Sequence, residues 1–174
     1  MHIKSPKKKL LLIQLNEINI ELVRKYQNNI QFQFFNEDFF NKLSITNSEE
    51  KYEFLEPWIQ WVSIYTGKSA NEHKVFRLGD IKNYSGDLIF NVIEKLNKSI
   101  GLICSMNVIN NLKKPKYFFS DPWTSNVSGP GKKIEFISKT IAQVVNLNSH
   151  KNIPINLYFK VLAILLISLR LKNI

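Results

Sequence analysis

Two sets of polar side chains stand where the sequence predicts the ends of regular elements. Glu56 directly precedes Pro57, which suits the first turn of a helix because proline lacks the N–H that would have no partner there. The entrance of a helix combines free N–H groups with a positive dipole end. A fold can place a nucleophile, a bound anion or a metal-binding carboxylate there. Alternatively, Glu56 is simply an acid at the start of a helix.

Asn16 and Glu17 form the second set, directly after the apolar run of residues 9–15. Such a run is typical of a parallel strand that is buried on both faces. A helical spacing of apolar residues follows at 18–26, so the pattern is a strand, a polar turn and a helix. Ligands of open α/β sheets gather at the carboxyl ends of the strands. We therefore expect these two residues at an edge suited to chemistry, or in a plain turn that begins the helix.

The elements that must position these residues centre on residues 53–80, which hold two of the three tryptophans. Apolar residues recur at helical spacing after Pro57, and Gly67 supplies the left-handed stop that commonly ends a helix. The loop that follows contains His73. We expect this histidine to bond a backbone carbonyl, with a ligand role as the alternative.

The rest of the chain adds further helices and strands. Asp87 is the expected N-cap of a helix at 87–96, and Asp121 follows a strand, either as a functional carboxylate or as part of an Asp-Pro turn. The segment 127–131 is a turn that lacks the spacing of a phosphate loop. The remaining predicted elements are strands at 44–46, 100–104 and 117–119 and helices at 134–147 and 155–171.

The last helix is apolar on all sides, so it needs burial all round. It is too short and too charged, at Lys160 and Arg170, for a membrane span of about 20 apolar residues. We expect the chain to be the N-terminal part of a larger protein. The rival explanation is contact with a membrane surface or with another protein chain through 155–171.

Charge is unevenly distributed along the 174 residues, whose formal net charge is +10. Residues 81–174 hold 13 Lys and Arg against 4 Asp and Glu. This surplus favours a phosphate-bearing small molecule or another anionic partner, although scattered lysines also form an ordinary solvated face. A nucleic-acid partner is not expected, because no dense basic stripe with interleaved aromatic residues is present.

Cysteine usage and the N-terminus bear on the compartment. The single cysteine, Cys104, excludes an intrachain disulfide and a thiolate metal cluster. The basic N-terminus is followed by too short an apolar run for a signal peptide. We therefore expect a cytoplasmic protein, with attachment to a membrane surface left open.

Several motifs resemble a known family. The spacing of Ser63, Thr66, Gly67 and His73 is similar to the nucleophile-helix region of the type I phosphodiesterase/nucleotide pyrophosphatase group in the alkaline phosphatase superfamily. The block LLLIQLNEIN resembles the first strand of that group, which ends in a metal-binding Asp. The blocks EPWIQWVSIYTG and VFRLGD resemble an uncharacterised bacterial branch of the superfamily. The resemblance covers residues 9–125.

The resemblance implies an α/β fold, a partial parallel sheet flanked by helices that forms an alkaline-phosphatase-like half-fold. It would occupy residues 1–125, followed by an incomplete helical segment at 126–174. The sequence departs from the family pattern in three places: Pro57 stands at the nucleophile position, Asn16 at the first metal ligand, and Lys74 after the histidine. No catalytic residue is therefore assigned.

The implied function is that of a truncated or degenerate relative of a metal-dependent phosphoester or phosphodiester hydrolase, inactive as an isolated chain. Asn16, Glu17 and Glu56 would supply part of a site for a divalent ion, Zn²⁺, Mn²⁺ or Mg²⁺. Oxygen ligands favour the harder ions Mg²⁺ and Mn²⁺. The alternative is a non-catalytic binding or structural module, whose apolar C-terminal helix packs on a partner or on a membrane surface.

Overall fold

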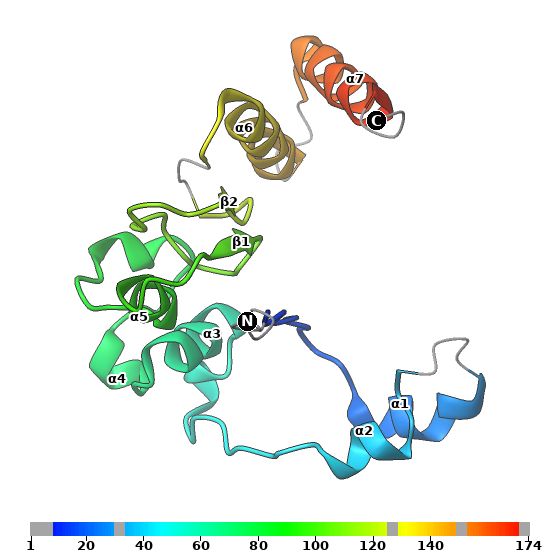
Figure 1. Cartoon of the computed structure of the whole chain (residues 1–174), viewed down its shortest axis with the longest axis vertical. Helices are drawn as coiled ribbons and strands as arrows, with labels where there is room; N and C mark the ends of the chain where they lie inside the picture. Colours follow the sequence, from blue (N-terminus) through cyan, green and yellow to red (C-terminus); the bar gives the residue numbers. More distant parts are fainter. Residues whose placement is uncertain (1–8, 30–33, 125–128, 149–152, 171–174) are drawn as a thin grey trace, which may run out of the picture. The chain divides into compact units, whose positions relative to one another are not determined.

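A computed structural model describes residues 9–29, 34–124, 129–148 and 153–170 of the chain (Figure 1). The chain separates into two units, Met1–Asn47 and Ser48–Ile174. The boundary predicted at 125/126 is a different kind of division, between an α/β part and a helical part, and it stays a prediction.

The first unit is small and helical. Asn19 and Asn36 begin its two α-helices, because their side-chain oxygens accept the N–H groups of Leu22 at 2.9 Å and Phe39 at 3.0 Å. The predicted helix at 18–26 is confirmed. The regular elements of this unit are α1 (Ile20–Tyr26), the 3-10 helix η1 (Gln27–Asn29) and α2 (Glu37–Asn41).

The buried strand predicted at residues 9–15 is wrong. This segment has no regular structure, and Leu10 and Leu11 are 89% and 81% exposed. An apolar run favours burial, but a strand also requires a neighbour that takes up its N–H and C=O groups. No described strand pairs with these residues. The short strand expected at 44–46 does not form either.

The second unit mixes helices with a two-stranded parallel sheet, in which Leu102 of one strand lies opposite Phe118 of the other. At this level the α/β prediction is confirmed. The strand at 117–119 is as predicted, whereas the strand expected at 100–104 is shorter, and only Leu102 of it is buried. The elements are η2 (Tyr52–Phe54), α3 (Pro57–Thr66), α4 (Ala70–His73), η3 (Asp80–Asn83), α5 (Ile89–Lys95), β1 (Gly101–Ile103), β2 (Tyr117–Phe119), α6 (Lys132–Asn148) and α7 (Ile155–Arg170).

Helix α3 begins and ends as the sequence predicts. Pro57 is its first residue, and Gly67 follows its last residue with a left-handed φ of 66°. The Gly67 N–H donates to the Ser63 carbonyl oxygen at 2.8 Å, which closes the last turn of the helix. The helix buries Ile59, Val62 and Tyr65.

The N-cap predicted for the next helix is wrong. Helix α5 begins at Ile89, and the side-chain oxygen of Asn91 accepts the Leu88 N–H at 3.0 Å. Asp87 instead pairs with Lys95. The helix thus begins two residues after Asp87, and Asn91 of its first turn binds the N–H of Leu88, the residue that precedes the helix.

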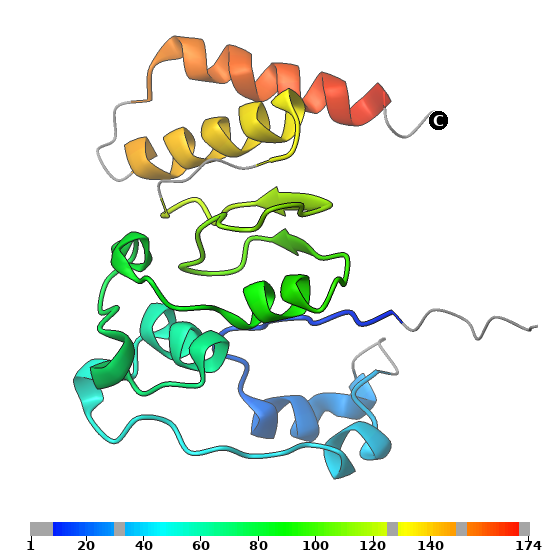
Figure 2. The same cartoon turned by 60° about the vertical axis from the view of Figure 1, so that its left-hand side comes forward.

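The core of the second unit lies between α3, α5 and the sheet. Val62 and Tyr65 pack there with Phe90 and with one residue of each strand, and the Tyr65 and Phe90 rings are 5.0 Å apart. Helix α6 lies between β2 and α7, so α7 rests on another helix and not on this core (Figure 2). None of the described helices is long and apolar enough to cross a membrane.

Candidate functional site

The three predicted metal ligands belong to two units. Asn16 and Glu17 are exposed residues in the segment before α1, and Glu17 has a left-handed φ of 57°. Glu56 is the exposed N-cap residue of α3, and its side chain makes no capping hydrogen bond. Their joint role as metal ligands stays a prediction. Within the described residues, no three His, Cys, Asp or Glu side chains form a group that could hold a metal ion.

Ser63 and His73 form the hydroxyl–imidazole pair that the family pattern singled out. Ser63 Oγ lies 3.0 Å from His73 Nε2, and His73 Nδ1 accepts the Val75 N–H at 3.0 Å. Because Nδ1 is the acceptor, neutral His73 carries its proton on Nε2 and donates it to Ser63. A general base for Ser63 would need an unprotonated Nε2. His73 therefore has the bonding of a structural histidine, but its backbone partner is the Val75 N–H and not the carbonyl that the sequence predicted.

Burial reinforces this role. His73 is 4% exposed, and removal from water lowers its pKa below the ordinary value, although Glu49 and Glu72 act in the opposite direction. The neutral imidazole is thus the form that the fold stabilises. The pair joins α3 to the end of α4 and does not activate the hydroxyl.

Asp121, the carboxylate predicted at the end of a strand, binds backbone N–H groups. It is 1% exposed, and it accepts N–H groups from Asn107 at 3.0 Å, Trp123 at 3.0 Å and Thr124 at 2.8 Å. These bonds correspond to the Asp-Pro turn that the sequence offered as the alternative. They also fix Thr124 in the loop that follows β2.

Asn107 completes the same junction. It is fully buried with a left-handed φ of 54°, and its side-chain oxygen accepts the Gly79 N–H at 3.0 Å. Its side-chain nitrogen donates to the carbonyl oxygens of Trp58 and Arg77, both at 3.1 Å. The loops after β1 and β2 are therefore tied to α3 and to the loop after α4.

Cys104 directly follows β1 and has little nucleophilic character. Partial burial of the thiol, and to a smaller extent the nearby Asp121 carboxylate, raise its pKa. A reactive thiol needs a lowered pKa and a base or cation beside it. The surroundings of Cys104 raise the pKa of its thiol, so they disfavour the reactive thiolate.

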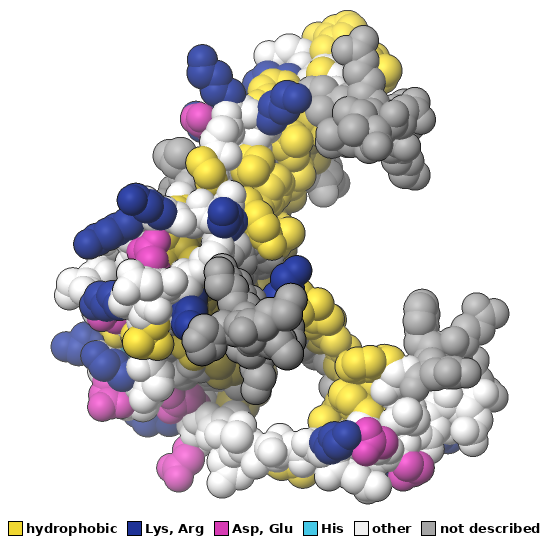
Figure 3. Space-filling model, in the orientation of Figure 1, with side chains coloured by type: hydrophobic (Ala, Val, Ile, Leu, Met, Phe, Trp, Pro, Cys, Tyr) yellow, Lys and Arg dark blue, Asp and Glu magenta, His cyan; other side chains and the backbone are white. Residues whose placement is uncertain are grey.

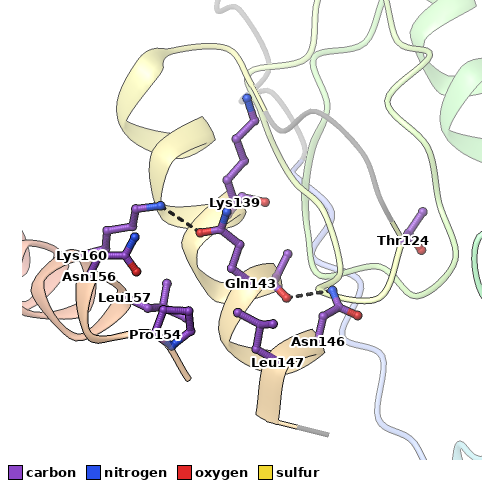
Figure 4. A pocket seen from close by; sticks show the side chains of 11 residues that line it. Thr124, Lys139, Gln143, Asn146, Leu147, Pro154, Asn156, Leu157 and Lys160 are labelled. Atoms are coloured by element: carbon purple, nitrogen blue, oxygen red, sulfur yellow. Dashed lines mark hydrogen bonds between the residues drawn. The ribbon is translucent and has the colours of Figure 1, made fainter. Parts of the chain in front are cut away.

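A groove of about 700 Å³ lies over α6. Figure 4 shows α6 as its floor, with Thr124 on one side and residues of α7 on the other. The opposite wall includes Pro154, which directly precedes α7, together with Leu157 and Lys160 of α7. The Lys160 ammonium donates to the Gln143 side-chain oxygen at 3.0 Å. The floor consists of two rows with a spacing of four residues: Ser138, Ala142 and Asn146, and Lys139, Gln143 and Leu147.

Beyond the groove, α7 presents a continuous apolar surface. Of its side chains that the structure describes, only Leu157 is buried. Large apolar residues recur at helical spacing on the exposed side, each between 53% and 76% exposed, and we call them the α7 stripe: Ile155, Tyr158, Phe159, Leu162, Leu165 and Leu166. Hydrophobic side chains reach the surface over α6 and α7 (Figure 3).

Comparisons of the chain with protein-family models, with curated proteins and with solved structures found no match. The resemblance to the alkaline phosphatase superfamily therefore rests on the sequence motifs alone and stays a prediction.

Sequence reasoning missed the groove. The sequence predicted a helix at 134–147, but Thr124, Gln143 and Lys160 form no motif together. They meet because the turn after β2 and the start of α7 lie on opposite sides of α6. The only available signal was the unusually apolar last helix, which indicated that something must pack along it.

Proposed function

We propose that this chain is a non-catalytic binding module, with an alkaline-phosphatase-like half-fold as its scaffold, that attaches to anionic membrane surfaces through the α7 stripe. The observation that carries the proposal is the stripe itself. Six large apolar side chains on one face of a 16-residue helix remain more than half exposed. Contiguous exposed apolar surface of this kind is typical of interaction sites.

The composition of the stripe suits the boundary between head groups and acyl chains. It contains no charged residue, and it includes an aromatic ring with a polar end at Tyr158. Amphipathic aromatic side chains favour that boundary, where one end is in apolar surroundings and the other in water. A helix that lies in the interface buries its apolar face without needing a complementary protein shape.

Charge supports a lipid surface over a second copy of the chain. The net charge of +10 attracts anionic head groups and repels an identical chain. The size of the stripe also favours a bilayer, since a stable protein–protein interface takes roughly 20–30 residues on each side. The stripe has six.

Vesicle co-sedimentation tests the proposal. The full chain is mixed with phosphatidylcholine vesicles that contain about a third phosphatidylglycerol, and with vesicles of phosphatidylcholine alone. We expect binding to the anionic vesicles that weakens with salt, because charge attraction is screened. Leu162→Glu should reduce binding at least tenfold, since burying one leucine side chain contributes about 1.5–3 kcal/mol.

Ile64→Glu is the matched control, because Ile64 is an exposed residue of α3, outside the stripe, and is 62% exposed. It should bind like the wild type. Equal weakening in the two variants, or no binding of the wild type to anionic vesicles, would overturn the proposal. So would a dimer in analytical ultracentrifugation that Leu162→Glu dissociates, because the stripe would then face a second copy.

The relation to a metal-dependent hydrolase stays a prediction. This prediction is tested by measuring the melting temperature with and without Mg²⁺, Mn²⁺ or Zn²⁺, for the wild type and for Glu17→Ala and Glu56→Ala. A shift that both variants abolish would support a shared ion. The absence of any shift would argue against these ligands.

A further inference from the structure

The groove over α6 contains a buried polar atom without a partner. Thr124 is 3% exposed, and its hydroxyl oxygen makes no hydrogen bond with any described residue. An unpaired buried hydroxyl costs about 1–3 kcal/mol, so such groups normally have a partner in the working state of a protein. Because Thr124 lines the groove, a bound molecule is the natural source of that partner.

The charges around the groove are of one sign. Two lysines, Lys139 and Lys160, line it, and no lining residue is acidic. Lys139 pairs with Glu135 at 2.6 Å, and this contact lowers the pKa of the Glu135 carboxyl. Lys160 is half-buried, its bonding partner Gln143 is neutral, and it forms no salt bridge within the described residues. Lys160 is therefore the cation available to an anionic ligand.

The remaining lining is largely apolar and lies between these polar groups. Ala142 and Leu147 contribute from α6, Leu157 from the first turn of α7, and Pro154 from the residue before that helix. A volume of about 700 Å³ is within the usual range for small-molecule sites, which are mostly apolar with a few placed polar groups. The ligand that matches has an anionic head and an apolar body.

We propose that the groove over α6 binds a small amphipathic anion, with its phosphate monoester or carboxylate head at Lys160, its apolar body over Ala142 and Leu157, and a polar group within reach of the Thr124 hydroxyl. The ligand is a single molecule in solution. The site does not depend on the α7 stripe, because Leu157 and Lys160 are not part of the stripe.

Isothermal titration calorimetry with the full chain tests this site. Octyl phosphate and octanoate, each below its micelle-forming concentration, are the probes. Inorganic phosphate represents the head alone, and octylammonium has the same apolar body with the opposite charge. We expect one octyl phosphate or octanoate per chain, with binding at least tenfold tighter than that of inorganic phosphate or octylammonium.

Three substitutions locate the site. Lys160→Met keeps the apolar stem and removes the charge, and it should weaken octyl phosphate binding at least tenfold, as expected for a hydrogen bond to a charged group. Thr124→Val keeps the shape and removes the hydroxyl, for an expected loss of about fivefold. Thr124→Ser keeps the hydroxyl and should bind within about twofold of the wild type. If Thr124→Val does not fold, Lys160→Met carries the test.

Two controls separate this site from other surfaces. Lys98→Met removes an exposed lysine elsewhere, and Leu162→Glu places a charge in the α7 stripe, so both variants should bind octyl phosphate like the wild type. Equal affinity for octylammonium, or unchanged binding in Lys160→Met, would overturn the proposal. A loss of binding in Leu162→Glu equal to that in Lys160→Met would place the probe on the stripe and would also overturn it. Because the vesicle experiment depends on Leu162 and this one does not, the two proposals fail separately.

Discussion

Helices α3 and α7 are both rich in apolar residues, but the fold uses them differently. The 10 residues of α3 bury Ile59, Val62 and Tyr65. The 16 residues of α7 bury only Leu157 among the side chains that the structure describes. Helix α3 contacts α4 and α5 and contributes to the core, whereas the main contact of α7 among the described elements is with α6.

Apolar content therefore predicts a helix, but it does not predict how much of the helix surface other elements will cover. In α3 the apolar side chains stabilise the fold, since each buried one contributes about 1.5–3 kcal/mol. In α7 most of them contribute little to folding and remain available for binding. The same type of residue therefore has a structural role in one helix and, in our proposal, a functional role in the other.

The largest difference between the two helices is expected when one apolar side chain is shortened in each. Ile59 is 2% exposed and Leu162 is 53% exposed. Ile59→Ala should reduce the free energy of unfolding by about 2–5 kcal/mol, because it removes buried methyl groups and leaves a cavity. Leu162→Ala should change it by less than about 0.5 kcal/mol. Urea unfolding followed by circular dichroism measures both values.

Similar losses in the two variants would contradict the comparison, because α7 would then be covered in solution. Repeating the measurement at several protein concentrations shows whether a second copy provides that cover. If the urea midpoint depends on protein concentration for the wild type but not for Leu162→Ala, a second copy of the chain covers α7.

A second substitution tests how much polar contacts stabilise the region around α3. Asn107 ties two loops to the region of α3, and Asn107→Ala leaves the Gly79 N–H and the carbonyl oxygens of Trp58 and Arg77 without its side chain. The expected loss is about 2 kcal/mol in the same urea experiment. Asn83→Ala, at an exposed position, is the control. Equal stability of the two variants would mean that water replaces the Asn107 bonds without cost.

The smallest effect concerns pH and acts on the α3 region. Because burial lowers the pKa of His73, the folded chain binds this proton less readily than the unfolded chain does. The stabilisation is complete above the unfolded pKa of about 6.5 and is lost as the pH falls from there through the lowered folded pKa. His73→Asn should flatten this decline, as measured by melting temperature against pH.

Ser63→Ala distinguishes the two ring nitrogens of His73. Protonation adds the new hydrogen at Nδ1, where it disrupts the bond from the Val75 N–H and leaves the side facing Ser63 unchanged. The variant should therefore keep the pH dependence of the wild type. A flattened curve in Ser63→Ala would show that the proton is added at Nε2 and would reverse the assigned tautomer.

The parts of the fold that the sequence predicted well depend on local chemistry. Pro57 and Gly67 bound α3 because each imposes its own backbone conformation, whatever the rest of the chain does. The strand predicted at 117–119 and the helices predicted at 18–26 and 155–171 also lie within two residues of the observed elements. The turn predicted at 127–131 lies partly outside the described residues.

The parts that could not be predicted depend on partners that lie far away in the sequence. Residues 9–15 have the composition of a buried strand, yet Leu10 and Leu11 remain exposed, because composition does not supply a neighbouring strand. The groove likewise needs Thr124 and Lys160, which come from separate elements. No spacing rule connects such positions before the chain is folded.

The contacts of Asn107 also have a consequence for the order of folding. Its side chain bonds residues that are 49, 30 and 28 positions away along the sequence. Closing loops of that length costs chain entropy before the contacts can compensate, so such links tend to form after local helices and turns. We therefore expect the Asn107 hydrogen bonds to form late in folding. Its removal should raise the unfolding rate and leave the refolding rate almost unchanged in stopped-flow experiments.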